Sequence, residues 1–163
     1  MKATLPFLFV CSALTACSVD EMTPEMVDAN GDGVISMSEA RSALEMVNIS
    51  SAEPGLYEFV ETTSFDRPET EPFKGEICLT EALARSPVVL MENGECSYEA
   101  FEVTSKTLNA VQSCEADGKT TRYRLSRRFG QTEFAEEVET QLPGEEIWST
   151  TERQFTRVGE CRE

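Results

Sequence analysis

From residue 55 onward the chain alternates hydrophobic and polar residues in short runs that turn-forming residues interrupt. This period of two is typical of β-strands with one buried face. It predicts strands over 56–65, 74–79, 98–105, 107–114, 120–129, 132–142 and 145–158, with one or two helical turns at 80–85. The turn signals are Asn93-Gly94, Asp117-Gly118, Gly130-Gln131 and Pro143-Gly144. Such closely spaced turns favour an antiparallel meander.

The predicted fold class is therefore mainly β: a curved antiparallel sheet, a sandwich or a small barrel. The hydrophobic side chains expected in its core are Leu56, Phe59, Phe101, Val103, Leu108, Ala110, Tyr123, Leu125, Phe134, Val138, Ile147 and Phe155. If the sheet curls, its concave face could hold an apolar ligand. Carriage of a small apolar molecule is thus one functional alternative.

The hairpin around Gly130-Gln131 can be given a register from its charges. A two-residue type II′ turn with glycine at its first central position suits this sequence. It would place three arginines opposite three glutamates on one face, with Tyr123 and Val138 on the other. The expected pairs are Arg128 with Glu133, Arg124 with Glu137, and Arg122 with Glu139. The arginine row could bind an anion, but its own counter-charges favour a solvated face.

The first third of the chain has a helical pattern instead. Met37, Ala40, Leu44 and Val47 recur every three to four residues and predict a helix. Thr23 and Pro24 suit the N-cap and first position of a preceding helix of about one turn. The polar stretch 49–54 reads as a linker. The predicted organisation is a signal peptide at 1–16, a short helical segment at 17–48, the linker, and a β domain at 55–163.

Oxygen-bearing residues between the two predicted helices have the spacing of a calcium loop. Ca²⁺ takes six to eight oxygen ligands in a twelve-residue loop. The candidate ligands are the side chains of Asp28, Asn30 and Asp32, the carbonyl of Val34, Ser36 through a water molecule, and the bidentate carboxylate of Glu39. Gly33 lies at position 6, where the loop turns sharply, and Ile35 is apolar at position 8. The segment resembles an EF-hand, which implies Ca²⁺ as the bound cofactor.

This loop has no second copy in the sequence, and its incoming helix is short. A lone site of this kind is expected to bind Ca²⁺ with a dissociation constant on the order of 10⁻⁴ M, as extracellular modules do. Its position before a linker suggests a calcium-stiffened stalk.

The N-terminus has the pattern of an export signal. Lys2 precedes an apolar run of about a dozen residues, which is too short to span a bilayer. The run ends in Leu14-Thr15-Ala16-Cys17, which resembles a bacterial lipobox. That resemblance implies diacylation of Cys17, and Ser18 resembles the residue that follows the cysteine in lipoproteins sorted to the outer membrane. The expected location is the cell envelope, on the outer membrane facing the periplasm.

Four cysteines remain for disulfides once Cys11 leaves with the signal and Cys17 carries lipid. They are Cys78, Cys96, Cys114 and Cys161. An even number in an oxidising compartment predicts two disulfides, although the sequence allows three pairings. We favour Cys78–Cys96, which brackets a short excursion, and Cys114–Cys161, which ties down the C-terminus. Zinc is the weaker reading because the chain has no CxxC spacing and no histidine.

Composition limits the function further. The formal net charge is −16, and loss of Lys2 with the signal makes the mature chain one unit more negative. Such a surface repels nucleic acid, so no nucleic-acid partner is expected. The absence of histidine removes Ser-His-Asp and Cys-His catalysis. A carboxylate-dependent hydrolase stays formally open, but we expect a protein that is not an enzyme.

Residues 52–161 resemble the bacterial domain-of-unknown-function family 3617. The resemblance is carried by Pro54-Gly55-Leu56-Tyr57-Glu58, by Cys78-Leu79-Thr80, by Cys96 and Cys114, and by Arg157-Val158-Gly159-Glu160-Cys161. Tyr57 stands where members typically have tryptophan. The resemblance implies an exported, cysteine-stapled β domain and assigns no catalytic or binding residue. The expected function is a lipid-anchored, calcium-binding envelope protein whose β domain binds an unknown partner or ligand or has a structural role.

Overall fold

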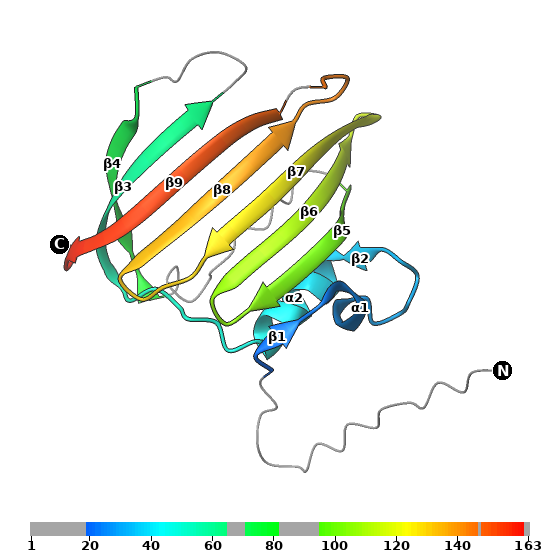
Figure 1. Ribbon diagram of the computed structural model, residues 1–163, viewed down its shortest axis with the longest axis horizontal. Helices are drawn as coiled ribbons and strands as arrows, with labels where there is room; N and C mark the ends of the chain where they lie inside the picture. Colours follow the sequence, from blue (N-terminus) through cyan, green and yellow to red (C-terminus); the bar gives the residue numbers. More distant parts are fainter. Residues whose placement is uncertain (1–18, 65–70, 82–94, 147, 162–163) are drawn as a thin grey trace, which may run out of the picture.

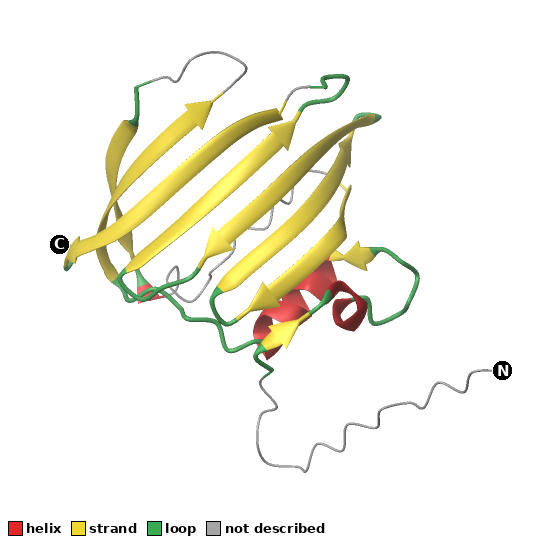
Figure 2. Cartoon of the chain, in the orientation of Figure 1, coloured by secondary structure: helices red, strands yellow, loops and turns green. Residues whose placement is uncertain are grey.

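A single open, curved antiparallel sheet forms the body of the protein, with two short helices at one end of it (Figures 1 and 2). The computed structural model describes residues 19–64, 71–81, 95–146 and 148–161. The strands are β1 (Glu21–Met22), β2 (Ile35–Ser36), β3 (Gly55–Ser64), β4 (Phe73–Leu79), β5 (Glu95–Thr104), β6 (Thr107–Ala116), β7 (Lys119–Arg128), β8 (Glu133–Gln141) and β9 (Trp148–Gly159). The helices are α1 (Pro24–Val27) and α2 (Met37–Met46).

The strand order is β1-β5-β6-β7-β8-β9-β3-β4, and β2 also pairs with β5. Strands β5 to β9 therefore form the predicted meander, and the β3–β4 hairpin joins it beside β9. The mainly β fold class is confirmed, and among the three predicted architectures the curved sheet is correct. We call the face against which α2 packs the inner face and the opposite one the outer face.

Most strand boundaries follow the predicted ones because the turn residues behave as their chemistry requires. Asp117 and Gly118 have φ of 52° and 69°, as a two-residue type I′ turn needs, and they join β6 to β7. Gly144 has φ of 79° in the turn before β9. The predicted turn at Asn93-Gly94 and most of the predicted helix at 80–85 lie outside the described residues.

The predicted register of the β7–β8 hairpin is wrong by two residues. Arg128 lies opposite Ala135, and Arg124 lies opposite Glu139 rather than Glu137. Gly130 does not have the positive φ that a type II′ turn requires. A shift of two leaves every side chain on its predicted face, so the sorting of charges between the faces survives.

The loop between β7 and β8 is longer than the predicted two-residue turn, because its backbone groups form hydrogen bonds with other segments. The amide of Phe129 donates to the carbonyl of Lys106 at 2.7 Å. The carbonyl of Gln131 accepts hydrogen bonds from the amide of Glu53 and the hydroxyl of Tyr57, each at 2.8 Å. These bonds attach the 49–54 segment to the hairpin, and a local sequence pattern cannot reveal them.

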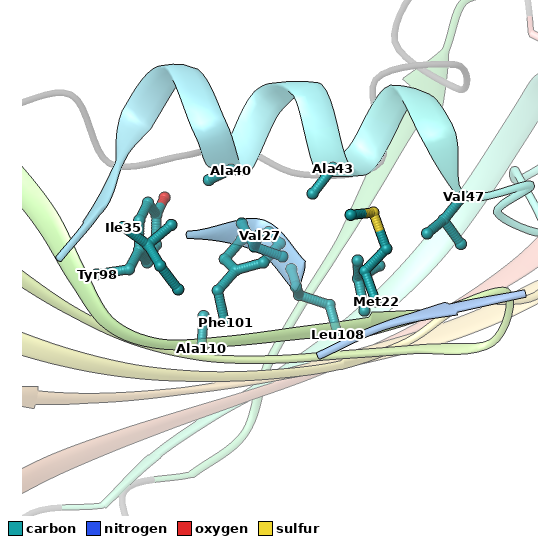
Figure 3. Close-up of a cluster of buried hydrophobic side chains, with 11 residues drawn as sticks. Met22, Val27, Ile35, Ala40, Ala43, Val47, Tyr98, Phe101, Leu108 and Ala110 are labelled. Atoms are coloured by element: carbon teal, nitrogen blue, oxygen red, sulfur yellow. The ribbon is translucent and has the colours of Figure 1, made fainter. Parts of the chain in front are cut away.

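The main hydrophobic core lies between α2 and the β5–β6 end of the inner face (Figure 3). Ala40 and Ala43 are fully buried on the helix, and their small side chains let it approach the sheet closely. Phe101 and Leu108 are fully buried beneath them. Met22, Val27, Ile35 and Val47 from the N-terminal segment complete the same cluster.

A calcium-stiffened stalk is therefore not what the N-terminal segment forms. Residues 22–47 share one core with the sheet, because the apolar stripe of α2 has no other surface to cover. Val19, two residues after Cys17, forms a parallel bridge with Val47. Cys17 itself lies outside the described residues.

The predicted core is confirmed where the helix covers the sheet. Phe101, Val103, Leu108 and Ala110 are buried there, and Phe134 is buried farther along the sheet. The side chain of Ile147 lies outside the description, and the other expected core residues are half-buried: Leu56, Phe59, Tyr123, Leu125, Val138 and Phe155. Tyr57 and Tyr98 are buried but were not expected in the core.

The favoured disulfide pairing is wrong. The structure joins Cys78 to Cys161 and Cys96 to Cys114. Cys96 and Cys114 are direct partners on β5 and β6. Cys78 and Gly159 are both direct partners of Leu56 on β3, so Cys161, two residues beyond Gly159, reaches Cys78 across the start of β3.

We expect replacement of Ala43 by leucine to lower the free energy of unfolding by about 1–3 kcal/mol, because the larger side chain overpacks the helix–sheet contact. The matched control is Glu45→Leu on the exposed side of α2, which should change stability by less than about 0.5 kcal/mol. Urea denaturation measures both. Equal effects of the two substitutions would contradict a helix packed on the sheet.

The two disulfides should contribute unequally to stability, because the chain-entropy model scales with loop length. Their sequence separations are 83 and 18 residues. Replacing Cys78 and Cys161 with serine should cost about 4–5 kcal/mol, against about 3 kcal/mol for Cys96 and Cys114. Mass spectrometry of unreduced peptides checks the connectivity directly, and a Cys78–Cys96 peptide would disprove it.

Candidate calcium site

The candidate calcium loop, residues 28–39, connects α1 to α2 at the β5 edge of the sheet (Figure 1). Pro24 occupies the first helical position of α1, although Thr23 makes no side-chain capping hydrogen bond there. The helix has only four residues, and the amide of Asp28 donates to the carbonyl of Pro24 at 2.9 Å. This short helix therefore fixes where the first candidate ligand begins the loop.

Asp28 directs both carboxylate oxygens into the loop. Its Oδ1 accepts from the amide of Gly31 at 2.8 Å, and its Oδ2 accepts from the amide of Gly33 at 2.9 Å. The two glycines have φ of 71° and 83°, a region that residues with a β-carbon rarely adopt. The chain can thus fold around the carboxylate because glycine stands at these two positions.

The next two candidate ligands form successive turns. The side-chain oxygen of Asn30 accepts from the amide of Asp32, and Oδ1 of Asp32 accepts from the amide of Val34, each at 2.8 Å. Short polar side chains commonly bind the backbone two residues onward in this way. The loop therefore holds its oxygens in a fixed order along the chain.

Glu39 closes the loop from the other end. Its Oε1 accepts from the amide of Ala29 at 3.1 Å, while its Oε2 accepts from the amide and the hydroxyl of Ser36 at 2.9 and 2.7 Å. Ser36 in turn caps α2, so the two residues form a capping box. The carboxylate of Glu39 thus bridges the first and last parts of the loop.

The hydroxyl of Ser36 lowers the pKa of Glu39, and backbone amides add to this effect. A lowered pKa favours the ionised form that binds a cation. The stability that these bonds provide is present above the ordinary glutamate pKa. This stability is lost as the pH falls through the lowered pKa of Glu39 in the folded protein.

These residues fit a calcium ion by chemistry and by position. Carboxylates from both ends of the loop and two side chains between them offer hard oxygen ligands around one short ring. In the described part of the chain, no three acidic, histidine or cysteine side chains already converge at metal-binding distance. Loop amides instead satisfy the oxygens that an ion would take, so binding would exchange those hydrogen bonds for metal contacts.

The loop is completed by the β domain and not by a second loop of its kind. Ile35 pairs with Tyr98 and Ser36 with Ser97, which makes β2 a short extension of the sheet beyond β5. Ile35 is 3% exposed and Tyr98 is 2% exposed. The apolar residue at position 8 of the loop is the one sequence signal for this contact, and nothing in the sequence pattern identifies Tyr98 as its partner.

The predicted arginine row lies on the outer face. Arg124 binds Glu139 at 3.2 Å, and Arg122 binds Glu99 rather than a β8 residue. Arg124 also lies 4.1 Å from the centre of the Trp148 ring. Arg128, the third member, is exposed and lies opposite Ala135. Because Arg122 and Arg124 already have glutamate partners, this part of the row is a solvated face with its own counter-charges.

A second row of charges crosses the inner face and was not foreseen. Arg127, Glu136, Arg153 and Glu61 are direct cross-strand partners on β7, β8, β9 and β3. Arg153 binds Glu61 at 2.5 Å and Glu136 at 2.9 Å. Burial lowers the pKa of Arg127, and its buried Nε has no hydrogen-bond acceptor among the described residues. The true hairpin register would have revealed this alternation of signs.

Both glutamates of this inner-face row form ion pairs with arginine. Glu61 and Glu136 lie on either side of Arg153, which binds both carboxylates. General acid–base catalysis needs a carboxylate poised to exchange a proton with a substrate. The arrangement is that of a charge ladder within a sheet.

Two surface hollows bear on the carriage of a small apolar molecule. One hollow touches Phe134 and Phe155, but its other lining includes Arg128, Glu133, Gln154 and Thr156. Another lies over the outer face near Arg124 and Glu139. Neither is the dry aromatic pocket that an apolar ligand requires.

No described helix is long and apolar enough to cross a membrane. The sequence model of DUF3617, a family of proteins of unknown function, matches residues 52–161. No curated protein and no solved structure matches the chain. The match covers about two thirds of the sequence, from the linker to the last cysteine, and the chain belongs to this family. The calcium loop lies outside the matched region.

Proposed function

We propose that this DUF3617 protein is an exported, lipid-anchored protein of the bacterial cell envelope that binds one calcium ion. The observation that carries the calcium proposal is the placement of Asp28 and Glu39. They come from opposite ends of the loop, and both direct their carboxylates into it. The β domain then serves as the platform for the loop and has a structural or partner-binding role.

The ion would be held by six residues with distinct roles. Asp28, Asn30 and Asp32 supply side-chain oxygens, Val34 supplies its carbonyl, Ser36 acts through a water molecule, and Glu39 binds through both carboxylate oxygens. Within this site the ion supplies positive charge and order rather than chemistry. We assign no enzymatic activity, because the chain has no histidine and the inner-face acids Glu61 and Glu136 are bound by Arg153.

Calcium should stabilise the whole fold and not only the loop. The loop is followed directly by α2, which shares its core with β5 and β6. A ligand that binds only the folded state adds stability as the logarithm of its concentration over its dissociation constant. With a dissociation constant on the order of 10⁻⁴ M, about 5 mM Ca²⁺ would add roughly 2 kcal/mol.

Glu39→Gln should abolish calcium binding with little loss of fold, because glutamine can still serve in a capping box. Isothermal titration calorimetry should give heat for the wild-type chain and none for this variant. The thermal midpoint should rise with about 5 mM Ca²⁺ only in the wild type.

The matched control is Glu45→Gln, which removes one acid from the same helix outside the loop. It should bind calcium as the wild type does, which separates site binding from general attraction to an acidic surface. Absence of both heat and thermal shift in the wild type at about 5 mM Ca²⁺ would sink the calcium proposal.

Three observations support export and lipid anchoring. Leu14-Thr15-Ala16-Cys17 follows an apolar run with the pattern of a lipobox. The two disulfides suit an oxidising compartment. A cysteine that carries two or more acyl chains anchors a protein stably to a membrane, at about 0.8 kcal/mol per buried CH₂. We place the protein on the outer membrane, facing the periplasm.

Cys17→Ala should prevent lipid attachment. In cells fed a labelled fatty acid, the wild-type chain should carry the label and the variant should not. Cys11→Ala is the control, because that residue lies within the signal and should leave labelling unchanged. Equal labelling of the wild type and Cys17→Ala would show that Cys17 is not the attachment site.

A further inference from the structure

The two edges of the sheet differ in whether short strands pair with them. The edge of β5 that faces away from β6 is covered by β1 and β2, which pair with it at Thr104, Val103, Tyr98 and Ser97. At the other edge, β4 pairs with β3 through seven residues. Among the described residues, no strand pairs with the free edge of β4. An open edge presents unpaired backbone amides and carbonyls, which is a template for another strand.

The sequence of β4 is self-complementary about Gly75. Phe73 and Ile77 lie on the inner face, and they are 61% and 39% exposed. Lys74 and Glu76 lie on the outer face, one residue to either side of Gly75. The order is thus apolar, basic, glycine, acidic, apolar. Reversing the direction of the strand exchanges the two charges and leaves the apolar positions in place.

We infer that β4 pairs antiparallel with β4 of a second copy of this chain, about a two-fold axis at Gly75. Lys74 of each copy then faces Glu76 of the other, and Phe73 faces Ile77. Direct cross-strand partners of opposite charge, and apolar partners, stabilise antiparallel pairs. The two curved sheets would become one continuous sheet.

Neighbouring registers lack this match. Centring the pair on Glu76 would place that carboxylate opposite itself, and centring it on Lys74 would do the same for the ammonium group. A shift of one residue would bring the apolar face of one copy beside the polar face of the other. Only the register about Gly75 satisfies both the charges and the apolar side chains.

Within the monomer Glu76 lies beside a second acid. Its direct partner on β3 is Glu58, which carries the same charge. Neither Lys74 nor Glu76 forms an ion pair with any other described side chain. Lys74 of a second copy would supply the missing counter-charge on the open side of the strand.

The edge is also preorganised for pairing. The disulfide between Cys78 and Cys161 fixes one end of β4 to the end of β9. The Phe59 ring lies over Gly75, where a β-carbon would come within 2.7 Å of it. A strand held in this way loses little conformational entropy when it pairs. The contact is nevertheless short, so we expect a dissociation constant in the micromolar range.

The test is charge reversal in the full-length chain, purified in a mild detergent and examined by sedimentation velocity at about 0.15 M salt. At that ionic strength, charges more than about 8 Å apart are largely screened, so the repulsion between two acidic copies is reduced. The wild type should show a concentration-dependent dimer. Lys74→Glu and Glu76→Lys should each weaken it at least about tenfold, because like charges then meet twice across the axis.

Two combinations separate edge pairing from any other cause of association. The double variant Lys74→Glu with Glu76→Lys restores opposite charges and should dimerise to within a few-fold of the wild type. A mixture of the two single variants should form a heterodimer, although each alone dimerises at least about tenfold more weakly than the wild type. Circular dichroism and thermal midpoints should match the wild type, since both side chains are exposed.

A wild type that stays monomeric would overturn the inference. So would association that none of the substitutions alters, which would assign it to lipid or detergent. Failure of the two single variants to associate when mixed would exclude the register about Gly75. None of these results depends on calcium, so the test is independent of the proposed calcium site.

Discussion

The structure depends on the contact between the alanine face of α2 and the β5–β6 end of the sheet. Ala40 and Ala43 have no exposed surface, and Phe101 and Leu108 below them are equally buried. Together with Val27 of α1 and the pairing of β1 and β2 with β5, this contact joins the N-terminal segment to the β domain. It also places the start of α2, and with it Glu39, at a fixed position beside β5. The loop geometry is therefore a consequence of packing outside the loop.

The two faces of the sheet handle charge by different means. On the outer face, exposed arginines and glutamates pair loosely in water, where such pairs contribute little. On the inner face, Arg127, Glu136, Arg153 and Glu61 alternate in sign across four neighbouring strands, and each partner is partly removed from solvent. Partial burial makes an unpaired member costly, so such a row favours one register over its neighbours. The charges of the inner face thus specify strand alignment as well as satisfying one another.

Local chemistry made much of the fold predictable. Alternation located the strands from β3 to β9, and the positive φ that Asp117-Gly118 supplies located a turn. The spacing of Asp28, Asn30, Asp32 and Glu39 predicted that these side chains share one loop, and the structure places them around it. What failed was set by contacts between distant segments. The hairpin register depends on Tyr57 and Glu53 binding Gln131, and the disulfide pairing depends on β3 lying between β4 and β9. The sequence around the hairpin and around the cysteines does not reveal either of these long-range contacts.

The bridge between Val19 and Val47 would limit how the protein is oriented if Cys17 carries lipid. Val19 comes two residues after Cys17, and an extended chain of that length spans about 7 Å at most. A lipid on Cys17 would therefore attach the protein by the β1–β5 edge of the sheet, with almost no slack. The opposite edge, at β4, would lie the whole width of the sheet away from the anchor. Copies tethered in this way could turn about their anchors but could not tumble, which would keep their β4 edges within one sheet's width of the lipid surface.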